Sequence, residues 1–234
     1  MPRVPRGYLV VDGQGDVQAA PNLVTRLWSD LELPHMIWPE ATRIAGPNNR
    51  TRFEKISRFI YGRTDEIDAL LVLTDEDDRC PKKTAPEIAS WLSDLNLPVP
   101  AAVVLLHREY ETLFLPCLSL MAGRPLENRQ GVLRPGLPSG LEYPTTNYED
   151  RRGVKEWLTR QLPPGRSYKE TTDQLALTRM LDFDVLRASA LPCFGSLERS
   201  LLFLAKNLGC RGAVYPKADH LVTAESPSHV VRRT

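Results

Sequence analysis

The segment Ala69-Leu-Leu-Val-Leu-Thr74 gives the clearest strand signal in the chain, because it is continuously apolar up to its final threonine. A strand with apolar side chains on both faces is typical of the centre of a parallel sheet, which helices cover on both sides. The strand leads directly into Asp75-Glu-Asp-Asp78, so acidic side chains leave the sheet at its end. This stretch therefore predicts a buried parallel strand with a polar cluster at its carboxyl end.

Outward from this strand, the first half of the chain alternates between strand and helix patterns. Tyr8-Leu-Val-Val11 and residues 101–106 are apolar runs of strand length, whereas His35-Met-Ile-Trp38 is a weaker strand signal that Pro39 limits. Apolar side chains recur at helical spacing in residues 21–33, 50–62 and 84–97, the last opened by a capping box at Thr84. The alternation predicts an α/β fold, with a parallel sheet flanked by helices.

The second half of the chain has a different character. A helix pattern at 110–121 closes an α/β domain that we place at residues 1–122. Eight glycines and prolines in 123–144 predict a loop without regular structure. Helix patterns then predict a helical C-terminal subdomain at 145–210, followed by an irregular tail at 211–234.

The composition excludes several classes of protein and indicates a compartment. With 30 basic and 29 acidic residues the chain is not uniformly basic, and 42% apolar residues exclude a disordered chain. The longest wholly apolar run, residues 101–106, is far too short to span a membrane. The four cysteines lie far apart without a C-x-x-C pair, which argues against a zinc site and favours the reducing cytoplasm.

Carboxylates follow three of the strands that we predict. They are Asp12 and Asp16, then Asp75 and Asp77, then Glu109 and Glu111. The carboxyl ends of parallel strands meet at one edge of a sheet, so these side chains should converge. Mg²⁺ prefers such oxygen ligands, and a pair of ions can activate water and stabilise the leaving oxygen of a phosphodiester. For each carboxylate taken singly, an ordinary solvated loop residue remains the alternative.

Two segments concentrate basic side chains. One lies within 43–63 and the other within 151–169, and each contains six basic residues and few acids. Such patches could neutralise the phosphates of a nucleic acid beside an acidic metal site, although a solvated helix face is the alternative for each residue alone. The residues that we predict to contact nucleic acid are Arg50, Arg52, Lys55, Arg58, Arg151 and Arg152.

The order of these motifs resembles the Toprim domain, the catalytic fold of topoisomerases, DnaG-type primases and nucleases of the overcoming-lysogenization-defect kind. The resemblance rests on Val10-Val-Asp-Gly-Gln-Gly-Asp16, on Leu71-Val-Leu-Thr-Asp-Glu-Asp-Asp-Arg-Cys-Pro81 and on Arg108-Glu-Tyr-Glu111. Residues 167–174 and 192–199 are similar to C-terminal signatures of one branch. That branch is a small prokaryotic Toprim-like family of unknown function, often encoded beside an ATPase in a mobile or defence setting.

The resemblance implies a metal-dependent nuclease that cleaves DNA or RNA with Mg²⁺ or Mn²⁺. It implies that Asp75 and Asp77 bind metal, that Asp12 is a ligand or general base with Asp16 beside it, and that Glu109 or Glu111 supports a second ion. Lys169, within the C-terminal signature, would contact the scissile phosphate. The expected setting is cytoplasmic anti-phage defence, as an effector subunit beside a separate ATPase, with homo-oligomer formation left open.

The resemblance leaves two alternatives. The family usually has Glu where this chain has Asp12 and Asp16, and aspartate is one methylene shorter. That difference favours a non-catalytic Toprim-like assembly or sensor subunit of an ATPase complex. Primase-like nucleotide polymerisation uses the same acids and is the least favoured, because the chain has no identifiable zinc module.

Overall fold

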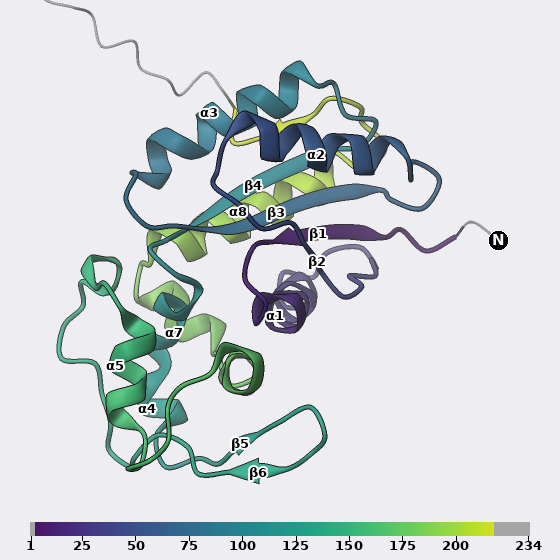
Figure 1. Ribbon diagram of the computed structural model, residues 1–234. Helices are drawn as coiled ribbons and strands as arrows, with labels where there is room; N and C mark the ends of the chain where they lie inside the picture. The colour runs from purple at the N-terminus through teal and green to yellow at the C-terminus, as the bar shows by residue number, and fades with distance from the viewer. Residues whose placement is uncertain (1–2, 218–234) are drawn as a thin grey trace, which may run out of the picture.

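Five parallel strands form the central sheet of the computed structural model, which describes residues 3–217 (Figure 1). The strand order is β2-β1-β3-β4-β7. The strands are β1 (Gly7–Val11), β2 (Thr42–Arg43), β3 (Ala69–Glu76), β4 (Ala101–His107) and β7 (Val214–Tyr215). The prediction of an α/β fold with a parallel sheet and flanking helices is confirmed.

The central pair, β3 and β4, forms the longest ladder in the sheet. Its register runs from Leu70 opposite Ala101 to Glu76 opposite His107. Residues 69–74 and 101–106 are buried throughout, as continuous apolar runs covered on both faces should be. This burial holds the ends of the two strands in fixed positions at one edge of the sheet.

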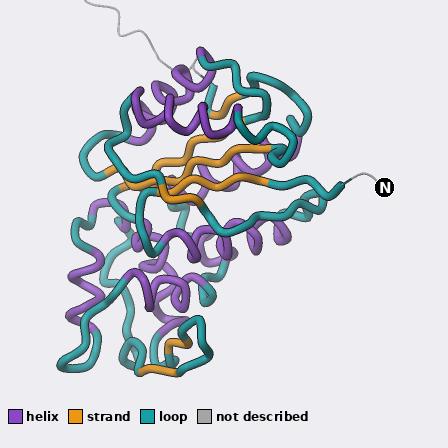
Figure 2. The backbone as a smooth tube through the Cα atoms, turned by 45° about the vertical axis from the view of Figure 1, so that its right-hand side comes forward, coloured by secondary structure: helices purple, strands orange, loops and turns teal. Residues whose placement is uncertain are grey.

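Helices cover both faces of the sheet and divide the core in two (Figure 2). Helices α1 (Asp16–Asp30) and α8 (Pro192–Lys206) pack on the face that receives Leu71 and Leu73 of β3. Helices α2 (Arg50–Tyr61) and α3 (Pro81–Asp94) pack on the face that receives Leu70 and Val72. Because strand side chains alternate, residue 75 points toward the α1 face and residue 76 toward the α2 face.

The C-terminal region packs in the same core as α1 and α8. Leu158, Leu177 and Phe194 share one apolar cluster with the β3 residues of that face. Besides α8, this region comprises η2 (Tyr148–Asp150), α5 (Val154–Gln161), the π-helical turn η3 (Glu170–Gln174), α6 (Leu175–Thr178) and α7 (Phe183–Ala188). The helical region expected at 145–210 is therefore present, and it is built onto the sheet.

Several local predictions are wrong. Residues 35–38 form only an isolated bridge between Ile37 and Arg6, and the short edge strand lies at β2 instead. Helix α3 begins at Pro81, a residue suited to a first helical turn, so Thr84 is not its cap.

The segment after β4 and the glycine- and proline-rich segment also differ from expectation. Residues 110–117 form a 3₁₀ helix, η1 (Tyr110–Cys117), and α4 (Leu118–Met121) follows. Strands β5 (Leu126–Glu127) and β6 (Leu133–Arg134) pair as a small antiparallel hairpin within 123–144. The expected irregular tail contributes β7, and its residues 218–234 lie outside the described residues.

We predict that Leu71→Ala lowers the free energy of unfolding by about 2–5 kcal/mol, because it leaves a cavity beneath α1 and α8. The matched control, Leu202→Ala on α8, removes a side chain that is 46% exposed and should cost no more than about 0.5 kcal/mol. Urea unfolding measures both values. Equal losses would contradict the assignment of β3 to the core.

Candidate functional site

Carboxylates from three strand ends converge on the α1 side of the sheet. Asp12 follows β1, Asp75 is the penultimate residue of β3, and Glu111 lies in η1, just after β4. Asp16 joins them as the first residue of α1. The charges of Asp16, Glu111 and Asp12 all act on Asp75, which places the four side chains in one group. We call these four residues the acidic cluster.

The C-terminal region supplies the polar partners of the acidic cluster. The Tyr168 hydroxyl donates a hydrogen bond to Glu111 Oε1 at 2.7 Å, and Gln174 Nε2 donates one to Asp16 Oδ1 at 2.6 Å. Lys155 Nζ of α5 lies 3.8 Å from Glu111 Oε2 and 2.6 Å from Glu170 Oε1. The cluster is thus closed by side chains that follow it in the chain by more than forty residues.

Gly15 makes this closure possible. A Cβ atom at Gly15 would lie 1.9 Å from Gln174 Oε1 and 2.9 Å from the backbone carbonyl carbon of Glu170. The backbone at the start of α1 therefore approaches η3 more closely than any residue with a side chain would allow. This approach brings Gln174 within reach of Asp16.

Three oxygen atoms of the acidic cluster are buried without a hydrogen-bond partner. They are Asp12 Oδ1, Asp75 Oδ1 and Glu111 Oε2. A buried carboxylate without a partner is costly, so it takes up a proton or a cation. Within the described residues, Lys155 is the cation whose charge acts on Asp16, Asp75 and Glu111.

Burial raises the pKa values of Asp16, Asp75 and Glu111 in the cluster. For Glu111 it raises the pKa to about 8, although Lys155 and Tyr168 both act in the opposite direction. Burial, followed by the charges of its acidic neighbours, raises the pKa of Asp75 well above its ordinary value. For Lys155, burial lowers the pKa, but the surrounding carboxylates outweigh this effect and raise it, so the ammonium stays charged. The cluster therefore contains more carboxyl groups than the single positive charge of Lys155 can neutralise.

The donor chemistry of the cluster fits a hard divalent cation. Asp12, Asp75 and Glu111 each have a buried carboxylate oxygen without a hydrogen-bond partner, and carboxylate oxygens are ligands that Mg²⁺ and Mn²⁺ prefer. Within residues 3–217, however, no group of three or more His, Cys, Asp or Glu side chains is already arranged to hold a metal ion. Binding would therefore require side-chain movement within the cluster.

Other residues that we expected at this site lie elsewhere. The Asp77 side chain is exposed and has no hydrogen bond or ion pair among the described residues, and only its backbone carbonyl is engaged, by Arg108. Glu109 Oε1 accepts a hydrogen bond from the backbone of Val154 at 2.6 Å, so it caps the start of α5. Lys169 is exposed, and its backbone N–H is bound to Asp173.

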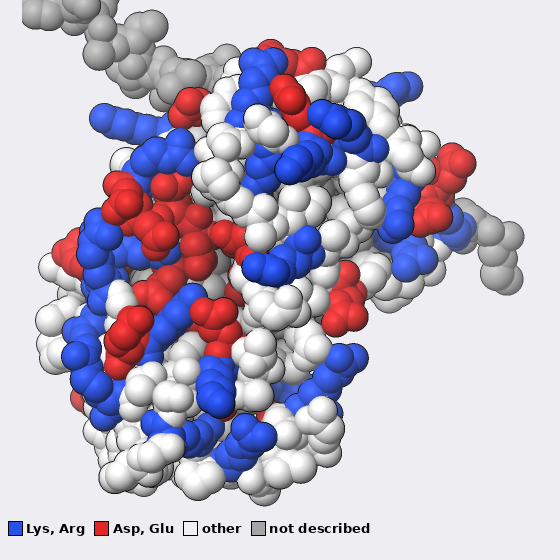
Figure 3. All heavy atoms as spheres, in the orientation of Figure 1, with Lys and Arg blue, Asp and Glu red and all other residues white. Residues whose placement is uncertain are grey.

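Most of the basic residues that we expected to contact nucleic acid have protein partners. Arg52 is buried and donates to Ile44, Asn48 and Thr74. Arg50 pairs with Asp94 and Arg152 with Asp78, while Arg151 lies over the Trp157 ring. Lys55 and Arg58 are exposed. Figure 3 shows acidic side chains gathered between the sheet and the lower helical region, with basic side chains on both sides.

Lys155, Tyr168 and Gln174 have contacts with the cluster that sequence analysis missed. Tyr168 and Gln174 fall inside the segment 167–174 that resembles a family signature, which was the available signal. Lys155 was counted only as one member of a basic patch. No pattern within α5 distinguishes it from the basic residues around it.

Comparisons with protein-family models, with curated proteins and with solved structures found no match. In the part of the chain that the structure describes, no helix is long and apolar enough to cross a membrane. All four cysteines have free thiols. The functional argument therefore rests on the acidic cluster and its surroundings.

We predict that the protein becomes less stable as pH rises from 5 to 8 in a chelating buffer. In this range Glu111 keeps its proton in the folded state, where its pKa is about 8, but loses it in the unfolded state, where the pKa is near 4.5. Glu111→Gln should flatten this slope, because glutamine cannot ionise. Urea unfolding at several pH values measures how the free energy of unfolding changes with pH, and Glu87→Gln, at an exposed position, is the control. A wild-type slope in Glu111→Gln would refute the assignment.

We also predict that Lys155→Met destabilises the protein in chelating buffer by roughly 2 kcal/mol, less than a fully buried pair because the side chain is partly exposed. The reason is that the substitution removes the cation nearest Glu111 and Glu170. The control is Lys83→Met, which changes an exposed lysine without an ion pair among the described residues. Thermal or urea unfolding compares the two, and similar stabilities would contradict a neutralising role for Lys155.

Proposed function

We propose that the protein is a metal-dependent phosphodiester hydrolase of the Toprim-like kind, acting on DNA or RNA with Mg²⁺ or Mn²⁺. The observation that carries the proposal is the set of three buried carboxylate oxygens without a hydrogen-bond partner, on Asp12, Asp75 and Glu111, delivered by three strand ends. A purely structural network would be expected to satisfy these atoms. The resemblance of the segments around Asp12, Asp75 and Glu111 to Toprim motifs supports the same chemistry.

In this proposal, Asp75 and Asp12 hold the metal ion and Asp16 and Glu111 complete its surroundings. The ion would supply Lewis-acid stabilisation of a phosphoryl oxygen and an activated water. Asp12 Oδ1, which has no hydrogen-bond partner, is free to accept a proton from that water. Lys155 Nζ places a positive charge beside Glu111, where it can neutralise charge on a bound phosphate.

The charge of Lys155 also affects how many divalent metal ions we expect the site to bind. A pair of divalent ions can stabilise both the attacking and the leaving oxygen of a displacement. Here one ammonium group already acts on Asp16, Asp75 and Glu111. We therefore propose that the site takes one divalent ion, with the charge of Lys155 in place of a second.

The biological setting of this proposal comes from the family resemblance. It comprises a cytoplasmic effector subunit beside a separate ATPase, in a prokaryotic anti-phage system, with nucleic acid as substrate. Lys55 and Arg58, both exposed on α2, remain available for phosphate contacts. Self-association of the chain is compatible with the proposal and is not required by it.

A specific observation favours the second candidate, a non-catalytic assembly or sensor subunit. Tyr168, Gln174 and Lys155 close over the acidic cluster and join the C-terminal region to the sheet. Such a network can be purely structural, holding the C-terminal region against the sheet. Cleavage by the protein, alone or with its ATPase, distinguishes the two candidates.

The test of the proposal is cleavage of single- and double-stranded DNA and RNA with Mn²⁺ or Mg²⁺, with and without the neighbouring ATPase. We predict that Asp75→Asn reduces cleavage by roughly 100-fold or more, the order of effect for losing one preorganised electrostatic contact in an active site. Glu87→Gln, which neutralises an exposed carboxylate on α3, should cleave like the wild type.

Circular dichroism and unfolding curves show whether each variant is folded. Undiminished cleavage by folded Asp75→Asn would refute the proposed site. Absence of metal-dependent cleavage by wild type under every condition, including the complex with the ATPase, would favour the non-catalytic candidate.

A further inference from the structure

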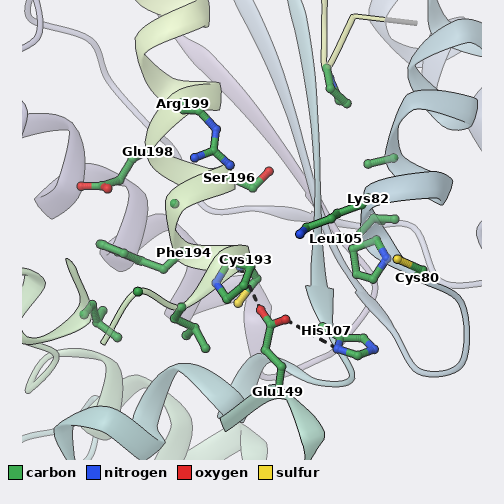
Figure 4. A pocket seen from close by; sticks show the side chains of 18 of the residues that line it. Cys80, Lys82, Leu105, His107, Glu149, Cys193, Phe194, Ser196, Glu198 and Arg199 are labelled. Carbon is green, nitrogen blue, oxygen red and sulfur yellow. Dashed lines mark hydrogen bonds and ion pairs between the residues drawn. The ribbon is translucent and has the colours of Figure 1, made fainter. Parts of the chain in front are cut away.

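A cavity of about 990 Å³ lies on the other side of β4, between the first turns of α3 and α8 (Figure 4). Its volume is at the upper end of the range of small-molecule sites, about 300–1,000 Å³. None of the four residues of the acidic cluster lines it. The cavity is therefore a separate feature of the molecule.

Two of the three cations that line this cavity lack acidic partners among the described residues, whereas Arg187 pairs with Glu198. Lys82 and Arg199 approach it from opposite sides, from α3 and α8, and neither has an ion pair among the described residues (Figure 4). Arg199 Nε donates a hydrogen bond to the Tyr215 hydroxyl at 3.1 Å, and no hydrogen bond from its two terminal nitrogens occurs in the described part of the chain. The guanidinium group is thus held at one nitrogen, with the other two left for a ligand.

The acids that line the cavity have hydrogen-bond partners within the protein. Glu149 Oε1 accepts a hydrogen bond from the backbone N–H of Cys193, and Glu149 Oε2 lies 3.6 Å from His107 Nδ1. Glu198 Oε1 accepts a hydrogen bond from Arg187 Nε at 2.8 Å. Among the residues that line the cavity, three cations (Lys82, Arg187 and Arg199) stand against two acids (Glu149 and Glu198), so the lining carries a net positive charge.

The architecture of α8 holds Arg199 over the cavity. A Cβ atom at Gly195, one turn earlier, would lie 3.2 Å from one terminal nitrogen of Arg199, so the absence of a side chain leaves room for the guanidinium. The Ser196 hydroxyl points to the same space (Figure 4). The first turns of α3 and α8 both line the cavity, and their positive dipole ends add to its attraction for anions.

We propose that this cavity binds a small organic phosphate, with its phosphate group between Lys82 and Arg199. Arginine offers a phosphate two parallel hydrogen bonds, and lysine adds a point charge opposite. Leu105 and Pro86 supply an apolar wall for the remainder of the ligand. The inference does not depend on the chemistry of the acidic cluster.

The test is calorimetric titration of the full-length protein with ribose 5-phosphate and with adenosine 5′-monophosphate, in a buffer without phosphate or metal. Adenosine is the uncharged control ligand. We predict saturable binding of at least one phosphate ester, weakened at least tenfold by Lys82→Ala and by Arg199→Ala. Lys83→Ala, a change of the neighbouring exposed lysine that does not line the cavity, should bind like wild type. Asp75→Asn should also bind like wild type.

Four results would overturn the proposal. One is the absence of saturable binding of both phosphate esters to the wild type. Another is unchanged binding in folded Lys82→Ala and Arg199→Ala proteins. The third is adenosine binding as tightly as its monophosphate, because the phosphate would then contribute nothing. Loss of binding in Asp75→Asn alone would place the ligand at the acidic cluster and would likewise reject this cavity.

Discussion

The repulsion among four carboxyl groups at the strand ends is the constraint on which the rest of this structure depends. A parallel sheet delivers Asp12 and Asp75 to the same edge, and Glu111 follows β4 into the same space. Burial there opposes ionisation and raises the pKa of Glu111 to about 8. The fold can retain these groups only where protons, hydrogen-bond donors or cations offset their charge.

The C-terminal region supplies that compensation, which explains why it shares a core with the sheet. Tyr168 and Gln174 donate hydrogen bonds to Glu111 and Asp16, and Lys155 brings an ammonium group between Glu111 and Glu170. Three carboxylate oxygens nevertheless have no hydrogen-bond partner, and a divalent cation would offset their charge. The same sheet carries a positively charged cavity across β4, so two sites of opposite charge lie on one scaffold.

The sequence predicts the parts of this arrangement that depend on local pattern. The apolar run at 69–74 identifies the central strand, and the order of strands indicates that Asp12, Asp75 and Glu111 share one edge. The sequence does not show that Asp77 is exposed, because a short acidic turn has no periodicity that predicts where each side chain points. Nor does it assign Lys155, whose role depends on how α5 packs against η1 and not on any pattern within α5. The role of Glu109 as a helix cap is missed for the same reason, because its partner, the backbone N–H of Val154, is 45 residues away in the chain.

The most direct test of the central claim is a calorimetric titration of Mn²⁺ into metal-free wild type and into Asp75→Asn. If the unpartnered carboxylates form a cation site, wild type should bind one Mn²⁺ ion per chain with saturable heat, and Asp75→Asn should bind at least tenfold more weakly. Equal binding by the two folded proteins would place the metal elsewhere. The absence of binding to both would contradict the claim that the cluster is built for a divalent cation, and would leave bound protons, Lys155 and the hydrogen bonds from Tyr168 and Gln174 as its compensation.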